Sequence, residues 1–123
     1  MKTKQTFTNS LHNAWTGIIE TIKTERNFKI HLFVASTVLF LSLYLKLNSI
    51  EFTVILITIG LVLSLEMLNT SIETLADQVD ANYNESIKKV KDASAGAVLV
   101  FSISAVIAGL LIFIPKLFIL NPF

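Results

Sequence analysis

Cysteine is absent from the 123 residues of this chain, which excludes disulfide bonds, thiolate catalysis and cysteine-ligated metal sites. Glycine is scarce too, and the four glycines are too scattered to build a phosphate loop ending in Gly-Lys-Ser/Thr. Ten Lys and Arg nearly balance nine Asp and Glu, and no basic face carries interleaved aromatics. The composition therefore gives no nucleic-acid footprint and no motif of a soluble-type kinase.

Apolar residues are abundant instead, at 53% of the chain, and the mean hydropathy is +0.67. At this length there is no room for a second domain, so we predict one all-α integral membrane domain over residues 1–123. The first 25 residues lack a compact apolar stretch with a small-residue cleavage site. We therefore expect no signal peptide, and insertion must rely on the hydrophobic helices.

The N-terminal segment has the pattern of an amphipathic helix. Apolar side chains recur at three- and four-residue steps from Phe7 to Ile22, and polar side chains fill the opposite face. We predict a surface helix over residues of about 7–24, too polar to span, with Trp15 anchoring it in the headgroup plane. Packing of this helix on the protein's own surface is an alternative that is compatible with the first.

Three apolar stretches are long enough to cross a bilayer. They predict transmembrane helices at residues of about 28–47, 50–79 and 86–114. Asn48 and Glu51 have capping-box spacing at the start of the second span, and Pro115 is expected to end the third. The polar residues from Asp80 to Val90 predict a water-exposed loop with an early helical turn.

The basic residues are distributed unevenly between the two sides of these spans. Only Lys46 and Lys116 belong to one side, whereas the other Lys and Arg residues fall in the N-terminal segment and near the loop at 80–90. The positive-inside rule then puts the N-terminus and this loop in the cytoplasm and the C-terminus outside.

The second span carries polar side chains in its cytoplasmic half. On a helix, Glu66, Asn69, Glu73 and Asp77 form a polar stripe about 80° wide. Acidic residues inside a span are costly and usually functional. Glu66 and Glu73 would be about 10 Å apart along the axis, with Asn69 between them, a spacing that suits a ligand with several oxygens.

The predicted topology brings further charges to the cytoplasmic end of the stripe. Five of them share one level: Glu25, Glu73, Asp77, Lys91 and Asp92. Clustered carboxylates repel one another unless a cation sits among them or some are protonated. Mg²⁺ would satisfy Glu25 and Glu73, because it commonly binds one or two carboxylates together with substrate phosphates. Lys91 would attract phosphate charge, and the deeper Glu66 could accept a hydroxyl proton. These roles describe phosphoryl transfer from a nucleotide to a lipid alcohol.

Other interpretations of the same residues stay open. Glu25 beside Arg26 is also typical of a solvated charge at the membrane interface. Asp92 beside Lys91 is also typical of a pair at the start of a helix. We expect His31, at the mouth of the first span, to be an interfacial packing residue. By itself the stripe fits a small proton or cation pathway equally well, and a non-catalytic membrane assembly factor is a third class.

A longer pattern joins the second span to the third. It runs Glu66-Met67-Leu68-Asn69-Thr70-Ser71-Ile72-Glu73, then Asp77, then Lys91-Asp92-Ala93-Ser94-Ala95-Gly96-Ala97-Val98-Leu99. This pattern resembles the signature of the small prokaryotic diacylglycerol kinase and undecaprenol kinase family. The resemblance covers nearly the whole chain, including the amphipathic start and all three spans.

The resemblance implies a role for each matching position. Glu66 would be the general base on the acceptor hydroxyl, and Glu25 and Glu73 would hold the Mg²⁺ that bridges the phosphates of ATP. Asn69 and Lys91 would contact those phosphates. The full set of nucleotide-binding positions would be Asn69, Asp77, Lys91 and Asp92.

The resemblance also implies partners and a location. The family is homotrimeric with sites between neighbouring subunits, and it lies in the bacterial cytoplasmic membrane with its active sites facing the cytoplasm. Undecaprenol is the expected acceptor, because Glu25 to His31 and Ile112 to Lys116 look like the Gram-positive undecaprenol kinase branch. Diacylglycerol, giving phosphatidic acid, is the alternative acceptor.

Overall fold

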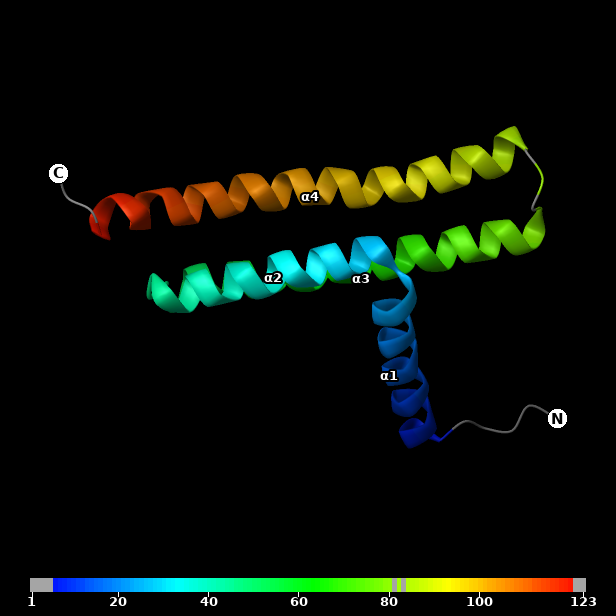
Figure 1. The fold of residues 1–123 in the computed structure, drawn as a ribbon, viewed down its shortest axis with the longest axis horizontal. Helices are drawn as coiled ribbons and strands as arrows, with labels where there is room; N and C mark the ends of the chain where they lie inside the picture. Colours follow the sequence, from blue (N-terminus) through cyan, green and yellow to red (C-terminus); the bar gives the residue numbers. More distant parts are fainter. Residues whose placement is uncertain (1–5, 81, 83, 121–123) are drawn as a thin grey trace.

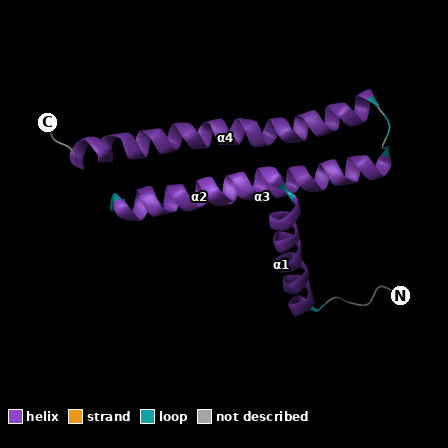
Figure 2. Ribbon diagram, viewed as in Figure 1, coloured by secondary structure: helices purple, strands orange, loops and turns teal. Residues whose placement is uncertain are grey.

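The computed structural model describes residues 6–80, 82 and 84–120, and all regular structure in them is helical (Figures 1 and 2). The four helices are α1 (Phe7–Thr24), α2 (Arg26–Tyr44), α3 (Ser49–Val79) and α4 (Glu85–Leu120). Three of them, α2, α3 and α4, are long and apolar enough to cross a membrane. The prediction of an all-α membrane fold with an N-terminal helix and three spans is confirmed.

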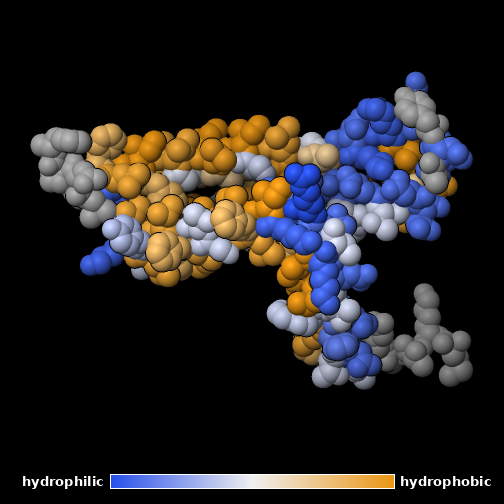
Figure 3. Space-filling model, in the orientation of Figure 1, coloured by the Kyte–Doolittle hydropathy of each residue, from blue (hydrophilic) through white to orange (hydrophobic). Residues whose placement is uncertain are grey.

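The three long helices run up and down in one bundle. α3 packs against both α2 and α4, while α1 leaves the bundle sideways where α2 begins (Figure 1). Most large apolar side chains of the bundle point outward, which in a bilayer places them against lipid. Polar side chains gather at the end of the bundle where α3 meets α4 (Figure 3).

The turn between α2 and α3 has a defined geometry at both ends. Lys46 takes a left-handed conformation with φ of 50°, and Leu47 N–H bonds to the Ser42 carbonyl at 3.1 Å, which closes α2 with a Schellman motif. Asn48 Oδ1 accepts from Glu51 N–H at 3.0 Å, and Glu51 Oε2 accepts from Asn48 N–H at 2.9 Å. The predicted capping box is confirmed, and α2 is made antiparallel to α3 by a short connection.

α4 differs from the sequence prediction at its C-terminal end. It begins at Glu85, where Asn84 Oδ1 accepts from Ser86 N–H at 2.9 Å, so the early helical turn expected within residues 80–90 is the start of α4. The expectation that Pro115 ends the helix was wrong, since α4 continues to Leu120. Proline removes one N–H from the helix and crowds the carbonyl of the preceding turn, but the neighbouring Lys116 holds this turn against α3 through an ion pair of 3.0 Å with Glu51.

Candidate functional site

The predicted polar stripe runs along α3 and becomes more exposed toward the C-terminal end of this helix. Glu66 and Asn69 are 4% and 7% exposed, Glu73 is half-buried and the Asp77 side chain is 58% exposed. Burying a carboxylate is unfavourable unless a partner or a proton compensates its charge. The surroundings of Glu66 therefore carry the most information about what the site does.

Glu66 faces α2. Its Oε2 atom lies 4.0 Å from Nε2 of His31, whose side chain is 26% exposed. In the part of the chain that the structure describes, no lysine or arginine pairs with Glu66. A buried carboxylate without a permanent cation partner can exchange a proton, which is what a general base needs.

His31 was expected only to pack at the interface, but it lies beside the buried Glu66. Its position follows from the short turn between α2 and α3. In an antiparallel pair of helices, residues equally distant from the turn lie side by side, and His31 and Glu66 are almost equally distant from Asn48. The capping box was thus a signal from which this contact could have been predicted.

Asn69 has one satisfied end and one unsatisfied end. Its Nδ2 donates to Glu73 Oε1 at 3.3 Å, one turn farther along α3. Only the amide nitrogen can donate to a carboxylate, so the partner fixes the orientation of the amide. The buried Oδ1 then has no hydrogen-bond partner in the structure. An unpaired buried acceptor is unusual, and here it marks a position where a ligand, an ion or water can bind.

The far end of the stripe faces α4. Lys91 Nζ donates to Asp77 Oδ1 at 2.8 Å, which joins the N-terminal part of α4 to the C-terminal part of α3. The sequence prediction that these two residues share one level agrees with this contact.

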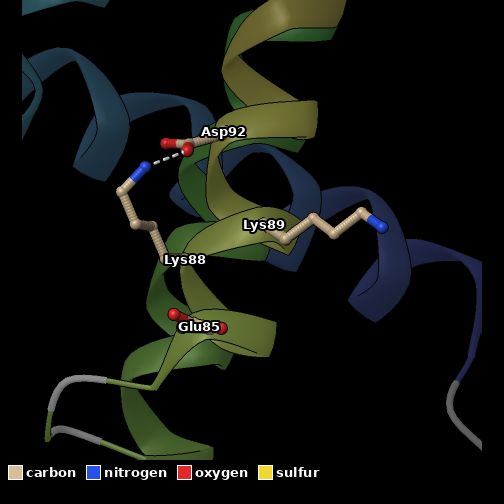
Figure 4. A pocket seen from close by; sticks show the side chains of 4 residues that line it. All are labelled: Glu85, Lys88, Lys89 and Asp92. Carbon is tan, nitrogen blue, oxygen red and sulfur yellow. Dashed lines mark hydrogen bonds and ion pairs between the residues drawn. The ribbon is translucent and has the colours of Figure 1, made fainter.

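Asp92, the next residue, is engaged elsewhere. It pairs with Lys88 one turn earlier on α4, and its side chain is 63% exposed (Figure 4). Together with Glu85 and Lys89 these two residues line an open hollow of about 350 Å³, and Lys89 points away from the pair. The structure therefore brings Lys91 to the stripe but leaves Asp92 on a separate, solvent-facing patch.

Glu25 forms the break between α1 and α2. Its N–H bonds to the Thr21 carbonyl at 2.9 Å, and its carboxylate accepts from Thr24 Oγ1 at 3.2 Å. Its backbone is extended, so the chain changes direction here. The contacts of the described residues do not join Glu25 directly to Glu73.

Helix register nevertheless relates these two carboxylates. Glu25 precedes His31 by six residues and Glu73 follows Glu66 by seven. Because α2 and α3 are antiparallel, both lie roughly 9 to 10 Å from the pair of His31 and Glu66, in the same direction along the bundle. Among the residues that the structure describes, no group of three or more His, Asp or Glu side chains is gathered to hold a metal ion. Helix register therefore puts Glu25 and Glu73 at one level of the bundle.

Fold and site together define a three-span membrane protein with a buried carboxylate in α3, below the polar end of the bundle where α3 meets α4. The sequence profile of the family described as prokaryotic diacylglycerol kinase matches residues 12–113. The chain therefore belongs to the prokaryotic diacylglycerol kinase family, and it is a lipid kinase of a bacterial membrane.

Named relatives agree with this assignment. The chain is 45% identical over 111 residues to an undecaprenol kinase of Bacillus subtilis (strain 168), covering 90% of each chain. It is 40% identical over 109 residues to a diacylglycerol kinase of Synechocystis sp., covering 88% of this chain and 62% of the relative. A diacylglycerol kinase of Haemophilus influenzae is 27% identical over 92 residues, which are 75% of this chain and 78% of the relative. The resemblance noted from the sequence is confirmed.

Proposed function

We propose that this lipid kinase transfers the γ-phosphoryl group of MgATP to the primary hydroxyl of undecaprenol. The observation that carries the proposal is the buried Glu66 carboxylate, which has His31 rather than a lysine or arginine beside it. The acceptor is favoured by similarity, since the relative named undecaprenol kinase is 45% identical over 90% of both chains. Diacylglycerol is the second candidate acceptor, favoured by the 40% identical relative.

The reaction follows from the polarity of the site. Glu66 accepts the proton of the lipid hydroxyl, and the hydroxyl oxygen forms a bond to the γ-phosphorus. The bond from that phosphorus to the oxygen shared with the β-phosphate breaks, and ADP leaves. Since no lysine or arginine among the described residues pairs with Glu66, its carboxylate can take this proton.

Glu25 and Glu73 are the residues that would hold Mg²⁺. Their shared level in the bundle, and the free Oδ1 of Asn69 next to Glu73, provide the hard oxygen donors that this ion prefers. Two carboxylates, rather than three, leave coordination positions for phosphate oxygens. When bound, the ion neutralises part of the charge on the transferring phosphoryl group.

The nucleotide would lie at the cytoplasmic end of the stripe. Lys91 reaches this end through its bond to Asp77, and it offers ammonium hydrogens to phosphate oxygens. Asn69 lies between Glu66 and Glu73, where the transferred group passes. Asp92 would act more remotely, since it is engaged by Lys88.

The orientation and assembly belong to the same proposal. The excess of Lys and Arg at the end that carries Lys91 favours a cytoplasmic active site. Within one chain, α2 begins at Arg26 and α3 continues well beyond that level, so Asp77 is left open to solvent (Figure 1). Neighbouring subunits of a homotrimer would cover this end. A mass measurement in mild detergent that finds only monomer in an active preparation would contradict the trimer.

The acceptor is tested by competition. The purified protein is incubated with Mg²⁺ and ATP labelled in the γ-phosphate, with undecaprenol and diacylglycerol offered together in mixed micelles. We expect label to enter undecaprenol faster than diacylglycerol. Faster labelling of diacylglycerol would assign the protein to the second acceptor, and no label in either lipid would refute the proposed function.

The base is tested by Glu66→Gln, which keeps the shape of the side chain and removes its basic carboxylate. Transfer should fall at least about a hundredfold, while binding of ATP changes little. Glu20→Gln, on the exposed face of α1, is the matched control and should keep normal activity. The pathway alternative is not retained, because the chain belongs to a family of lipid kinases.

A further inference from the structure

An apolar groove of about 440 Å³ lies between α2, α3 and α4. Its polar lining residues are His31, Thr58 and Ser102. Thr58 Oγ1 donates to the Val54 carbonyl at 2.7 Å, so its hydroxyl is already occupied by its own helix. Ser102 Oγ is buried and has no hydrogen-bond partner in the structure. One lining hydroxyl is therefore satisfied and the other is left unpaired.

Helix register places Ser102 at the depth of Glu66. Asp77 on α3 bonds to Lys91 on α4; Glu66 precedes Asp77 by eleven residues, and Ser102 follows Lys91 by eleven. The two helices are antiparallel, so the equal steps end at the same level. The ion pair of Glu51 with Lys116 at the other end of the bundle fits nearly the same register. The register between α3 and α4 is therefore the same along the whole length of the two helices.

The groove extends from this level toward the end of the bundle where α2 turns into α3. His31 and Ser102 lie at one end, and Ile55 and Phe113 lie at the other. Glu66 and Ile55 are eleven residues apart on α3, or roughly 16 Å. The groove thus has the polarity of a membrane alcohol, with an apolar body and polar groups at the end nearer the cytoplasmic surface.

The contact between Glu66 and His31 leaves space for one more atom. At 4.0 Å the two side chains are too far apart for a direct hydrogen bond. An oxygen atom can lie about 2.8 Å from each of them, a usual hydrogen-bond length. Ser102, at the same level on the third helix, can supply a third contact to that oxygen.

We propose that His31 and Ser102 bind the hydroxyl of the acceptor lipid against Glu66, while the groove holds the first part of its hydrocarbon chain. This inference rests on the proposed function and extends it from the base to the binding of the acceptor. The hydroxyl donates to Glu66, and its oxygen accepts from His31 Nε2 or from Ser102 Oγ. The two residues select for an alcohol, because a chain that ends in a methyl group leaves both of them without a partner.

Ser102→Ala is the sharpest test, because the hydroxyl that it removes makes no bond in the free protein. The thermal midpoint should therefore not fall. The KM for undecaprenol should rise roughly threefold to tenfold, while the KM for ATP stays unchanged. Ser104→Ala is the matched control, since this exposed serine on α4 bonds to the Val100 carbonyl and should keep both KM values.

His31 is tested with two replacements of different chemistry. His31→Leu should raise the KM for undecaprenol about tenfold, and His31→Gln should recover most of the loss, because its amide nitrogen can take the place of Nε2. His12→Leu on α1, the exposed second histidine, is the control. Equal losses in the two His31 variants, or a shift in the KM for ATP, would overturn the assignment.

A binding measurement separates this inference from the activity. The affinity for undecaprenol is compared with the affinity for the same hydrocarbon without its hydroxyl, in the wild type and in Ser102→Ala. The wild type should prefer the alcohol, and the variant should lose a large part of the preference. An unchanged preference for the alcohol would refute the proposal. So would a variant that loses both its affinity for the lipid and its oligomeric mass, because a second protein chain would then be what fills the groove. Wild-type transfer that is abolished by Glu66→Gln but unaffected by Ser102→Ala would leave the proposed function standing and this inference refuted.

Discussion

The Lys116 ammonium lies 3.0 Å from the Glu51 carboxylate, which fastens the C-terminal part of α4 to the first turn of α3. At the opposite end of the same two helices, Lys91 bonds to Asp77 at 2.8 Å. The two ion pairs fix one antiparallel register over the length of the bundle. That register determines which residues of α4 lie beside the polar stripe, so a contact far from the stripe contributes to its geometry.

Removing either Glu51 or Lys116 from their ion pair should lower the thermal midpoint of the protein in mild detergent. Glu51→Ala should lower it more than Lys116→Ala, because Glu51 also accepts the N–H of Asn48 in the capping box. Circular dichroism at 222 nm, a far-ultraviolet helix signal, measures both, with Lys89→Ala as an exposed control. A larger effect of the lysine change would contradict this assignment.

Lys46→Gly should stabilise the protein by about 0.5–1 kcal/mol, because a left-handed φ of 50° strains a lysine and not a glycine. The matched change Lys89→Gly, at a helical position of α4, should instead destabilise it by about 1 kcal/mol. Thermal unfolding of both variants checks the opposite signs. A loss of stability in Lys46→Gly would show that the lysine side chain matters more than its backbone.

Asn69→Asp should lower phosphoryl transfer at least about a hundredfold. The change replaces the Nδ2 donor to Glu73 by a carboxylate oxygen at a distance of about one hydrogen bond, so two negative charges meet in a half-buried site. The rate should recover in part at high Mg²⁺, which screens this repulsion. Asn13→Asp on the exposed face of α1 is the control. Near-normal transfer in Asn69→Asp at low Mg²⁺ would contradict the role of Asn69.

Lys91→Met should raise the KM for ATP about tenfold, because the ammonium that would meet the phosphates is lost. Lys89→Met, two residues earlier on the same helix, should change it less than about twofold, since Lys89 points away from Asp92 and its partner Lys88 (Figure 4). Initial rates at varied ATP and saturating lipid distinguish the two. Equal effects would show that the site responds to overall charge rather than to Lys91.

The Asp80 carboxylate gives a test by pH. The N–H of Asn82 at 2.9 Å, and then the amide of Asn84 at 3.2 Å, hold the pKa of Asp80 below its ordinary value of 3.8. A lowered pKa stabilises the folded state above the ordinary value, and this contribution is lost as the pH falls through the folded value. The advantage in thermal midpoint of the wild type over Asp80→Asn should therefore shrink from neutral pH to about pH 3. An advantage that grows on acidification would contradict the assignment.

Local signals in the sequence were enough to predict most of the fold. The three spans follow from the length of the apolar stretches, and the surface helix from its three- and four-residue periodicity. The cap at Asn48 follows from its spacing to Glu51, and the alignment of Glu66 with Asp77 on one face follows from helix geometry alone. Each of these features depends on residues within a few turns of one another. The prediction that Pro115 ends α4 was wrong for a non-local reason, because an ion pair with the distant Glu51 helps to hold the helix beyond the proline.

The sequence by itself therefore determined that a stripe of costly carboxylates lies in the C-terminal half of one span and that the pattern is that of a lipid kinase. Only the tertiary structure decided which helix meets each end of the stripe: His31 of α2 at Glu66, and Lys91 of α4 at Asp77. It also brought Ser102, an ordinary residue of an apolar run, to the depth of Glu66 with its hydroxyl unpaired. The physical reason is that the periodicity of a helix fixes its own faces, whereas the register between helices is set by turns and ion pairs distant in sequence.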